Sequence, residues 1–336
     1  MITNKVKNVI LFTAVCGCFF LFFNNTRIVT DNIISTLHFC GNKLIPSIFP
    51  VMILSTVFSK INIKLFSGQN SEILKIVLFS WLSGFIVGPK QLSDKLENTE
   101  ITRYALLSSN AGIGFVISYV GLGLWNSLSF GIFLFVTQIV FSTIIFNFSK
   151  IKINPGIVKS KKTPILSAIS DSIVESTNSM ISICGFTVFF SALRQLICTV
   201  VKIHPNSVPF TAISAILEIS GGALSSAQEQ NILLSGFFTG FCVGFGGICM
   251  CMQTFAVCEK NIVNKTEFIG KKLIQGILCG ILSVLFVKLN NLMPSKYVYL
   301  GFEDGYNFCT VVTNTVFCFL VMFCTKKQIK NKLNSI

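Results

Sequence analysis

The sequence is short of charged residues. Only 12% of its 336 residues are Asp, Glu, Lys or Arg, and only 13 are acidic, whereas soluble domains average about 25% charged residues. Hydrophobic residues make up 52% of the chain, 34 of them Phe, and the mean hydropathy is +0.73. One soluble core cannot bury so much apolar surface. The composition therefore excludes a soluble enzyme, a disordered chain and a fibrous protein, and is typical of a protein that crosses a membrane several times.

Sequence motifs of catalytic and metal-binding sites are also missing. The chain has no Walker A, G-x-S-x-G, H-E-x-x-H or C-x-x-C motif and only two histidines. Its 13 cysteines lie mostly in apolar runs, where free cysteine packs as a small hydrophobe. The run Cys249–Met252 has the sulfur ligands that soft metals prefer, but all four side chains could converge only if the helix were unwound there. We therefore expect no enzyme activity, no metal site and no cofactor.

Long apolar stretches dominate what is present. A helix needs about 20 apolar residues to cross the hydrocarbon of a bilayer. The stretches lie at 9–23, 44–58, 73–88, 104–124, 128–148, 179–201, 208–226, 232–257, 268–287 and 306–325. The first follows Lys5 and Lys7 and could be a signal peptide, but no small-x-small cleavage site follows it, so it is predicted to be a transmembrane helix.

Two of these stretches differ from ordinary spans. Segment 73–88 contains Ser83, Gly84 and Gly88 and is followed by Pro89, and segment 208–226 contains Glu218. Glycine, proline and a carboxylate are tolerated at membrane depth only where the backbone is buried in protein or lines a cavity. Both segments are therefore predicted to be re-entrant hairpins, which enter the membrane and return to the same side.

The distribution of basic residues sets the predicted orientation. Lys and Arg concentrate in the cytoplasmic loops of membrane proteins, so the net charge of +14 indicates loop lysines here and not a nucleic-acid surface. With both termini in the cytoplasm and both hairpins non-crossing, most of the 27 basic residues fall on the cytoplasmic side, notably in the loop 149–178. Making only one hairpin a full span would reverse the later loops and abolish this bias.

This arrangement contains an inverted repeat. The order span, hairpin, span, span occurs in residues 44–148 and again, upside down, in residues 179–287. The pairs Ser83-Gly84 and Ser220-Gly221 mark the two hairpins. Inverted repeats with a binding site between them are a recurring plan of secondary transporters.

A glycine-rich span follows each hairpin. The first contains Asn110 and Gly112, and the second contains Gly246, Gly247 and Gln253. Glycine costs about 1 kcal/mol in a helix interior, so the clusters predict helices that break at mid-membrane and turn backbone groups toward a ligand. The alternative is close helix–helix packing by small residues, and Asn110 and Gln253 could equally serve as contacts between helices.

Charged residues at membrane depth complete the candidate site. Glu218 could bind a proton, a cation or a donor group of a solute. It could instead be a structural partner of Lys90, Arg194 or the hairpin N–H groups. Lys90 is expected to anchor its hairpin at the membrane interface, with binding of an anionic solute as the alternative. The candidate solute or ion site comprises Ser83, Gly84, Gly88, Asn110, Gly112, Glu218, Ser220, Gly221, Gly246, Gly247 and Gln253.

The chain resembles the YlbJ-like sporulation integral membrane proteins, a branch of the nucleoside-recognition or Gate domain family. The matching stretches are Leu44–Phe58, Ser83–Lys90, Asn110–Gly123, Ile183–Ser191, Leu217–Gly222 and Gly244–Gln253. The family tends to have proline where this chain has Ile86 and Ile113. The resemblance implies a bundle with two re-entrant hairpins, as in concentrative nucleoside transporters and the core of ferrous iron transporter B. It also implies a role in endospore formation, but no substrate.

Together these observations predict an all-α polytopic protein of the cell membrane, with about eight transmembrane helices and two re-entrant hairpins. The predicted parts are 1–43, an N-terminal helix and loop; 44–148, the first repeat; 149–178, a basic cytoplasmic loop; 179–287, the second repeat; and 288–336, a C-terminal helix and basic tail. The expected function is movement or binding of a small solute or ion, and the alternative is a non-transporting scaffold for spore envelope assembly. The expected partners are the lipid bilayer, the small solute or ion and, as a homo-oligomer, a second copy of the chain; no nucleic acid is expected.

Overall fold

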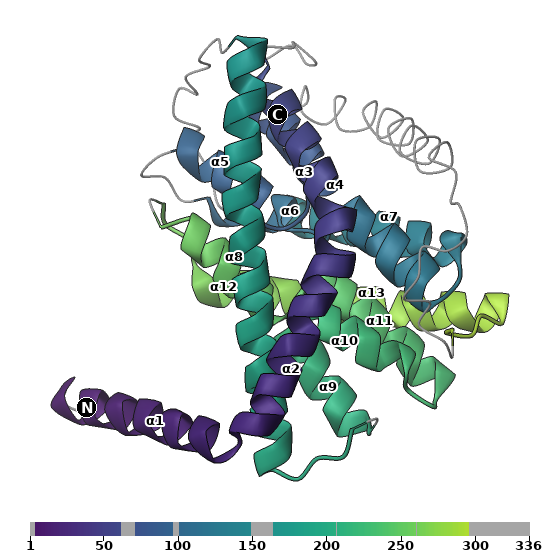
Figure 1. Cartoon of the computed structure of the whole chain (residues 1–336). Helices are drawn as coiled ribbons and strands as arrows, with labels where there is room; N and C mark the ends of the chain where they lie inside the picture. The colour runs from purple at the N-terminus through teal and green to yellow at the C-terminus, as the bar shows by residue number, and fades with distance from the viewer. Residues whose placement is uncertain are drawn as a thin grey trace. The chain divides into compact units, whose positions relative to one another are not determined.

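The computed structural model describes residues 4–61, 71–96, 101–148, 164–205, 207–259 and 261–295, and within these ranges every regular element is a helix (Figure 1). The helices are α1 (Asn4–Asn24), α2 (Thr26–Phe39), η1 (Cys40–Leu44), α3 (Ile45–Lys60), α4 (Ser71–Ser83), α5 (Val87–Lys95), α6 (Thr102–Ser108), η2 (Gly114–Leu124), α7 (Leu128–Phe148), α8 (Ile165–Val200), α9 (Val208–Leu217), α10 (Ile219–Ala227), α11 (Ile232–Phe245), α12 (Gly247–Val257) and α13 (Lys265–Asn290). The two η elements have the wider turns of a π-helix.

The all-α prediction is confirmed for these residues. Five helical stretches are long and apolar enough to cross a membrane: Thr26–Lys60, Leu128–Phe148, Ile165–Val200, Ile232–Val257 and Lys265–Asn290. The predicted span at 104–124 is divided into the short helices α6 and η2. The predicted span at 306–325, the tail and most of the basic loop lie outside the described residues.

Helices extend into two segments that were predicted to be loops. Residues 26–43, predicted to be a loop, continue helically into α3, and α8 begins at Ile165 inside the predicted loop 149–178. Helix α2 packs along α8 (Figure 1). Thr36 Oγ1 donates a hydrogen bond to Ser191 Oγ at 3.0 Å, and Ser191 Oγ donates to Asn32 Oδ1 at 3.0 Å. Asn32 and Thr36 therefore form polar contacts between the two helices.

Apolar side chains are exposed along one side of α13. Ile274, Ile277, Ile281 and Leu285 are each about half exposed, and their spacing of three or four residues places them on a single face of the helix. Soluble proteins do not leave such continuous apolar surface in water. The exposed row is typical of a helix that faces lipid.

A glycine seam joins α11 to α13. Gly236, Gly240 and Gly244 of α11 face Val287, Ser283 and Cys279 of α13, respectively. A Cβ atom on Gly240 would lie 2.1 Å from Ser283 Oγ and 2.7 Å from the Cys279 carbonyl oxygen. Small residues spaced four apart let membrane helices approach closely. For Gly244, the packing alternative is thus what the structure shows.

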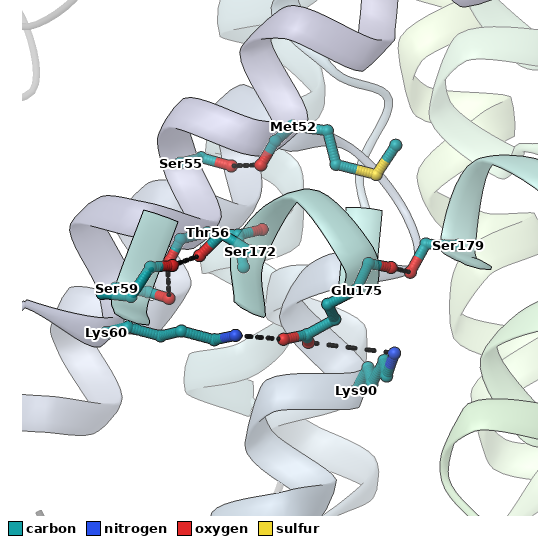
Figure 2. A network of polar contacts seen from close by, with 10 residues as sticks. Met52, Ser55, Thr56, Ser59, Lys60, Lys90, Ser172, Glu175 and Ser179 are labelled. Atoms are coloured by element: carbon teal, nitrogen blue, oxygen red, sulfur yellow. Dashed lines mark hydrogen bonds and ion pairs between the residues drawn. The ribbon is translucent and has the colours of Figure 1, made fainter. Parts of the chain in front are cut away.

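Glu175 of α8 joins α3 to α5. Its Oε2 lies 2.8 Å from Lys60 Nζ, and its Oε1 lies 3.8 Å from Lys90 Nζ. Figure 2 shows the two lysines approaching the carboxylate from different helices. Lys90 therefore fixes its hairpin to α8 through an ion pair.

Candidate functional site

The first predicted hairpin turns back on itself at Gly84. This residue has a left-handed φ of +97° and separates α4 from α5. A Cβ atom on Gly88 would lie 2.3 Å from Ser80 Cβ, whereas eight residues of unbroken helix would span about 12 Å. At the other end of the pair, Glu72 Oε2 and Lys95 Nζ are 3.0 Å apart. The two ends of the hairpin therefore lie together.

The second predicted hairpin turns back at Glu218. This residue is extended, with φ −151° and ψ 136°, and lies between α9 and α10. A Cβ atom on Gly222 would lie 2.8 Å from Ala215 Cα, and Thr211 Oγ1 of α9 donates a hydrogen bond of 3.3 Å to Glu229 Oε2, just beyond α10. Neither predicted hairpin is an unbroken helix.

Both glycine-rich spans are broken where the sequence predicts. Residues 109–112 are non-helical between α6 and η2. Gly246 and Gly247 have φ of +80° and +82° between α11 and α12. Left-handed φ favours glycine because a Cβ atom would clash with the backbone.

Each hairpin tip packs on the break of the helix that follows it. A Cβ atom on Gly112 would lie 3.2 Å from Gly84 N, and one on Gly247 would lie 2.9 Å from Glu218 N. Backbone meets backbone at both contacts, so side chains larger than glycine do not fit. The same tip-to-break contact thus occurs in both halves of the chain.

The two tips and the two breaks border one cavity of about 40 Å³, which has room for a few water molecules. Of the predicted site residues, the structure brings seven together in its lining: Ser83, Gly84, Gly112, Glu218, Ser220, Gly246 and Gln253. The remaining lining residues were not predicted as part of this site: Leu44, Ile48, Phe85, Phe115, Ile183, Thr187, Ile219, Cys249 and Met250. Of these, Cys249 and Met250 were considered in the sequence only as ligands of a soft metal. Most of the remaining lining residues are apolar and carry no sequence signal that separates them from core residues.

Four predicted site residues do not line this cavity. Gly88 packs against Ser80 and Ser108, and Gly247 packs against the backbone of Glu218. The guanidinium of Arg194 lies close to the Cα atom of Gly221. Asn110 belongs to a separate polar cluster. These four residues thus pack at the hairpin tips and helix breaks without facing the cavity.

The Glu218 carboxylate caps helix α10. Its Oε1 accepts a hydrogen bond from Ser220 N at 2.8 Å, and its Oε2 accepts one from Gly221 N at 2.7 Å. A negative charge at a helix N-terminus is favoured by the free N–H groups and the helix dipole. Among the sequence-based alternatives, the structure thus shows Glu218 as a partner of the hairpin N–H groups, while it also lines the cavity.

Arg194 of α8 provides a positive charge beside this cap. A Cβ atom on Gly221 would lie 2.2 Å from Arg194 Nη1 and 3.4 Å from Glu218 Oε2, so guanidinium and carboxylate flank the same point. The guanidinium also lies 5.5 Å from the centre of the Phe210 ring. The cavity wall therefore contains a carboxylate with a cation close behind it.

The sequence analysis missed a buried polar cluster at the first break. Gln138 Nε2 donates to the Ala111 carbonyl at 2.8 Å, and Gln138 Oε1 accepts from Ala111 N at 3.1 Å. Gln275 Nε2 donates to Asn110 Oδ1 at 2.9 Å. Lys272, buried on α13, belongs to the same cluster. Side chains thus satisfy backbone groups that the break leaves unpaired.

One curated protein resembles part of the chain. The sporulation integral membrane protein YlbJ of Bacillus subtilis (strain 168) is 19% identical over 165 residues, which cover 44% of this chain and 38% of that protein. No protein-family model matches the chain. No solved structure matches it either. The chain is thus a helical, membrane-like protein similar to a sporulation integral membrane protein.

Proposed function

We propose that the protein is transporter-like and binds a small solute or ion in the cavity between its hairpin tips. The observation that carries the proposal is that both hairpin tips and both helix breaks border this one cavity. Discontinuous helices around a mid-membrane site are the architecture by which many secondary transporters bind their cargo. The tip-to-break contact that occurs in both halves supports an inverted repeat, with one half rocking against the other to expose the site to alternate sides.

The chemistry of the cavity favours a small cargo. Its polar lining includes the Glu218 carboxylate, the Ser83 and Ser220 hydroxyls and the Gln253 amide, and most of the other lining side chains are apolar. The volume of about 40 Å³ suits an ion or a small polar group, and a nucleoside would require the tips to separate. The cargo class is therefore tested by measuring uptake of several candidate cargoes.

Uptake into proteoliposomes tests the proposal. The protein is compared with empty vesicles for uptake of a nucleoside, an amino acid, a dicarboxylate and a metal ion. For any cargo that is taken up, Glu218→Gln should reduce the rate at least about tenfold, because the charge at the cavity is lost while one oxygen still accepts a hydrogen bond.

Glu229→Gln is the matched control. Glu229 is a buried carboxylate at the base of the same hairpin, away from the cavity lining, and its amide replacement can still accept from Thr211. Uptake by this variant should remain close to that of the unchanged protein. Equal rates for the two glutamine variants would contradict a role for Glu218 in binding.

The alternative is a non-transporting membrane scaffold. It is favoured by the first break, where Gln138, Asn110, Gln275 and Lys272 already satisfy polar groups that could otherwise bind a cargo. Absence of uptake for the whole panel, together with loss of function when loop 149–178 is altered, would support the scaffold.

The proposed setting is endospore formation, in a membrane with both termini in the cytoplasm. The Bacillus subtilis relative is a sporulation integral membrane protein, which supports the setting. The excess of lysine in the predicted cytoplasmic loops supports the orientation. Deletion of the protein should lower spore yield or heat resistance. Unchanged values of both would contradict this role.

A further inference from the structure

The break between α6 and η2 surrounds a buried lysine from another helix. Seven polar residues meet there, and each is at most 1% exposed: Ser109, Asn110, Gln138, Ser142, Thr254, Lys272 and Gln275. They come from the break itself and from α7, α12 and α13. None of them lines the cavity between the hairpin tips, so this cluster is a separate site.

The Lys272 ammonium is held by neutral oxygen atoms. It donates to the backbone carbonyl of Ser109, to Gln275 Oε1 at 3.0 Å and to Asn110 Oδ1 at 3.5 Å. In the part of the chain that the structure describes, no carboxylate forms an ion pair with it. A buried charge without a counter-ion requires strong compensation by dipoles.

The break supplies these dipoles in a geometry that suits a cation. Ser109 is the C-terminal cap of α6, and the carbonyl end of a helix favours positive charge. One backbone carbonyl and two side-chain amide oxygens are hard, neutral ligands, the type that replaces the water shell of an alkali ion in proteins. Gln138 holds both backbone groups of Ala111, which keeps the neighbouring peptide in place.

We propose that Lys272 is a tethered cation that fills a monovalent-cation site at this break. The ammonium provides the single positive charge that the oxygen atoms require, so the break keeps its shape without a dissociable alkali ion. Removal of the side chain would leave the oxygen atoms around a vacant position that Li⁺, Na⁺ or K⁺ can fill. The proposal does not depend on transport. If the protein does move a solute, this break does not need a sodium ion for that movement.

Thermal unfolding of the purified full-length protein tests this directly. Unchanged protein and Lys272→Ala are compared in choline chloride and in LiCl, NaCl or KCl at equal ionic strength. The unchanged protein should melt at the same temperature in all four salts. Lys272→Ala should melt lower in choline chloride, and at least one alkali ion should raise its melting temperature by roughly 4 °C or more, saturably.

Two further variants make the outcome specific. Lys271→Ala removes the adjacent lysine, which pairs with Glu267 on the helix surface, and should show no dependence on alkali ions. Lys272→Met fills the position with an apolar chain and should be destabilised without rescue. The proposal is overturned if no alkali ion changes the melting or folded yield of Lys272→Ala, or if the unchanged protein is stabilised equally.

Discussion

At the residue scale, glycines with similar sequence surroundings have different roles. Gly246 and Gly247 form a helix break with left-handed backbone, whereas Gly244, two residues earlier, packs against Cys279 of α13. The sequence predicted both the break and the packing alternative but could not assign them to individual glycines. The assignment depends on which neighbouring helix approaches, and that contact comes from a distant part of the chain.

Gly247→Ala should destabilise the protein by about 2 kcal/mol or more. An alanine would adopt the left-handed region at a penalty of about 1–2 kcal/mol, and its Cβ atom would lie 2.9 Å from Glu218 N and the Leu217 carbonyl oxygen. The control is Gly270→Ala in α13, where no atom lies within 4 Å of the added Cβ and helix propensity improves. Thermal unfolding of both variants gives the comparison, and equal stability would contradict the account of this contact.

Lys272 shows why a charge count is insufficient at this scale. The predicted orientation counts the lysines of this chain as loop charges, as the positive-inside rule suggests. The structure places the Lys272 side chain fully inside the protein. Two of its three acceptors lie at a helix break far away in sequence, so local sequence could not distinguish it from the neighbouring Lys271.

At the element scale, breaks were easier to predict than helix ends. The breaks at 109–112 and at Gly246 follow from glycine clusters in otherwise apolar segments. The helical residues 26–43 were missed because they lie between the apolar stretches 9–23 and 44–58, and Asn32 and Thr36 among them contact Ser191 of α8. Polar contacts between membrane helices are not visible in local hydropathy.

The glycine seam between α11 and α13 gives a prediction for a pair of elements. Gly240→Val should separate the two helices and lower the melting temperature of the protein, because its side chain would overlap Ser283 and the Cys279 backbone. Overpacking of this kind typically costs about 1–3 kcal/mol. Gly185→Val in α8, with open space at its Cβ position, should have a much smaller effect. Equal melting temperatures would show that the seam is not tightly packed.

At the scale of the whole molecule, the account depends on two hairpins that enter the membrane from opposite sides. The structure shows that each hairpin returns on itself and that both tips border one cavity. The lysine distribution predicts that the two hairpins enter from opposite sides of the membrane.

Sidedness of the hairpin ends tests this central claim most directly. Single cysteines at Glu72 and Asp94, and at Pro209 and Gln230, are introduced into a variant without the native cysteines and labelled with a membrane-impermeant maleimide. The first pair should react only after the membrane is permeabilised, and the second pair should react in intact cells. Reaction of the two ends of one hairpin from opposite sides of the membrane would contradict the account.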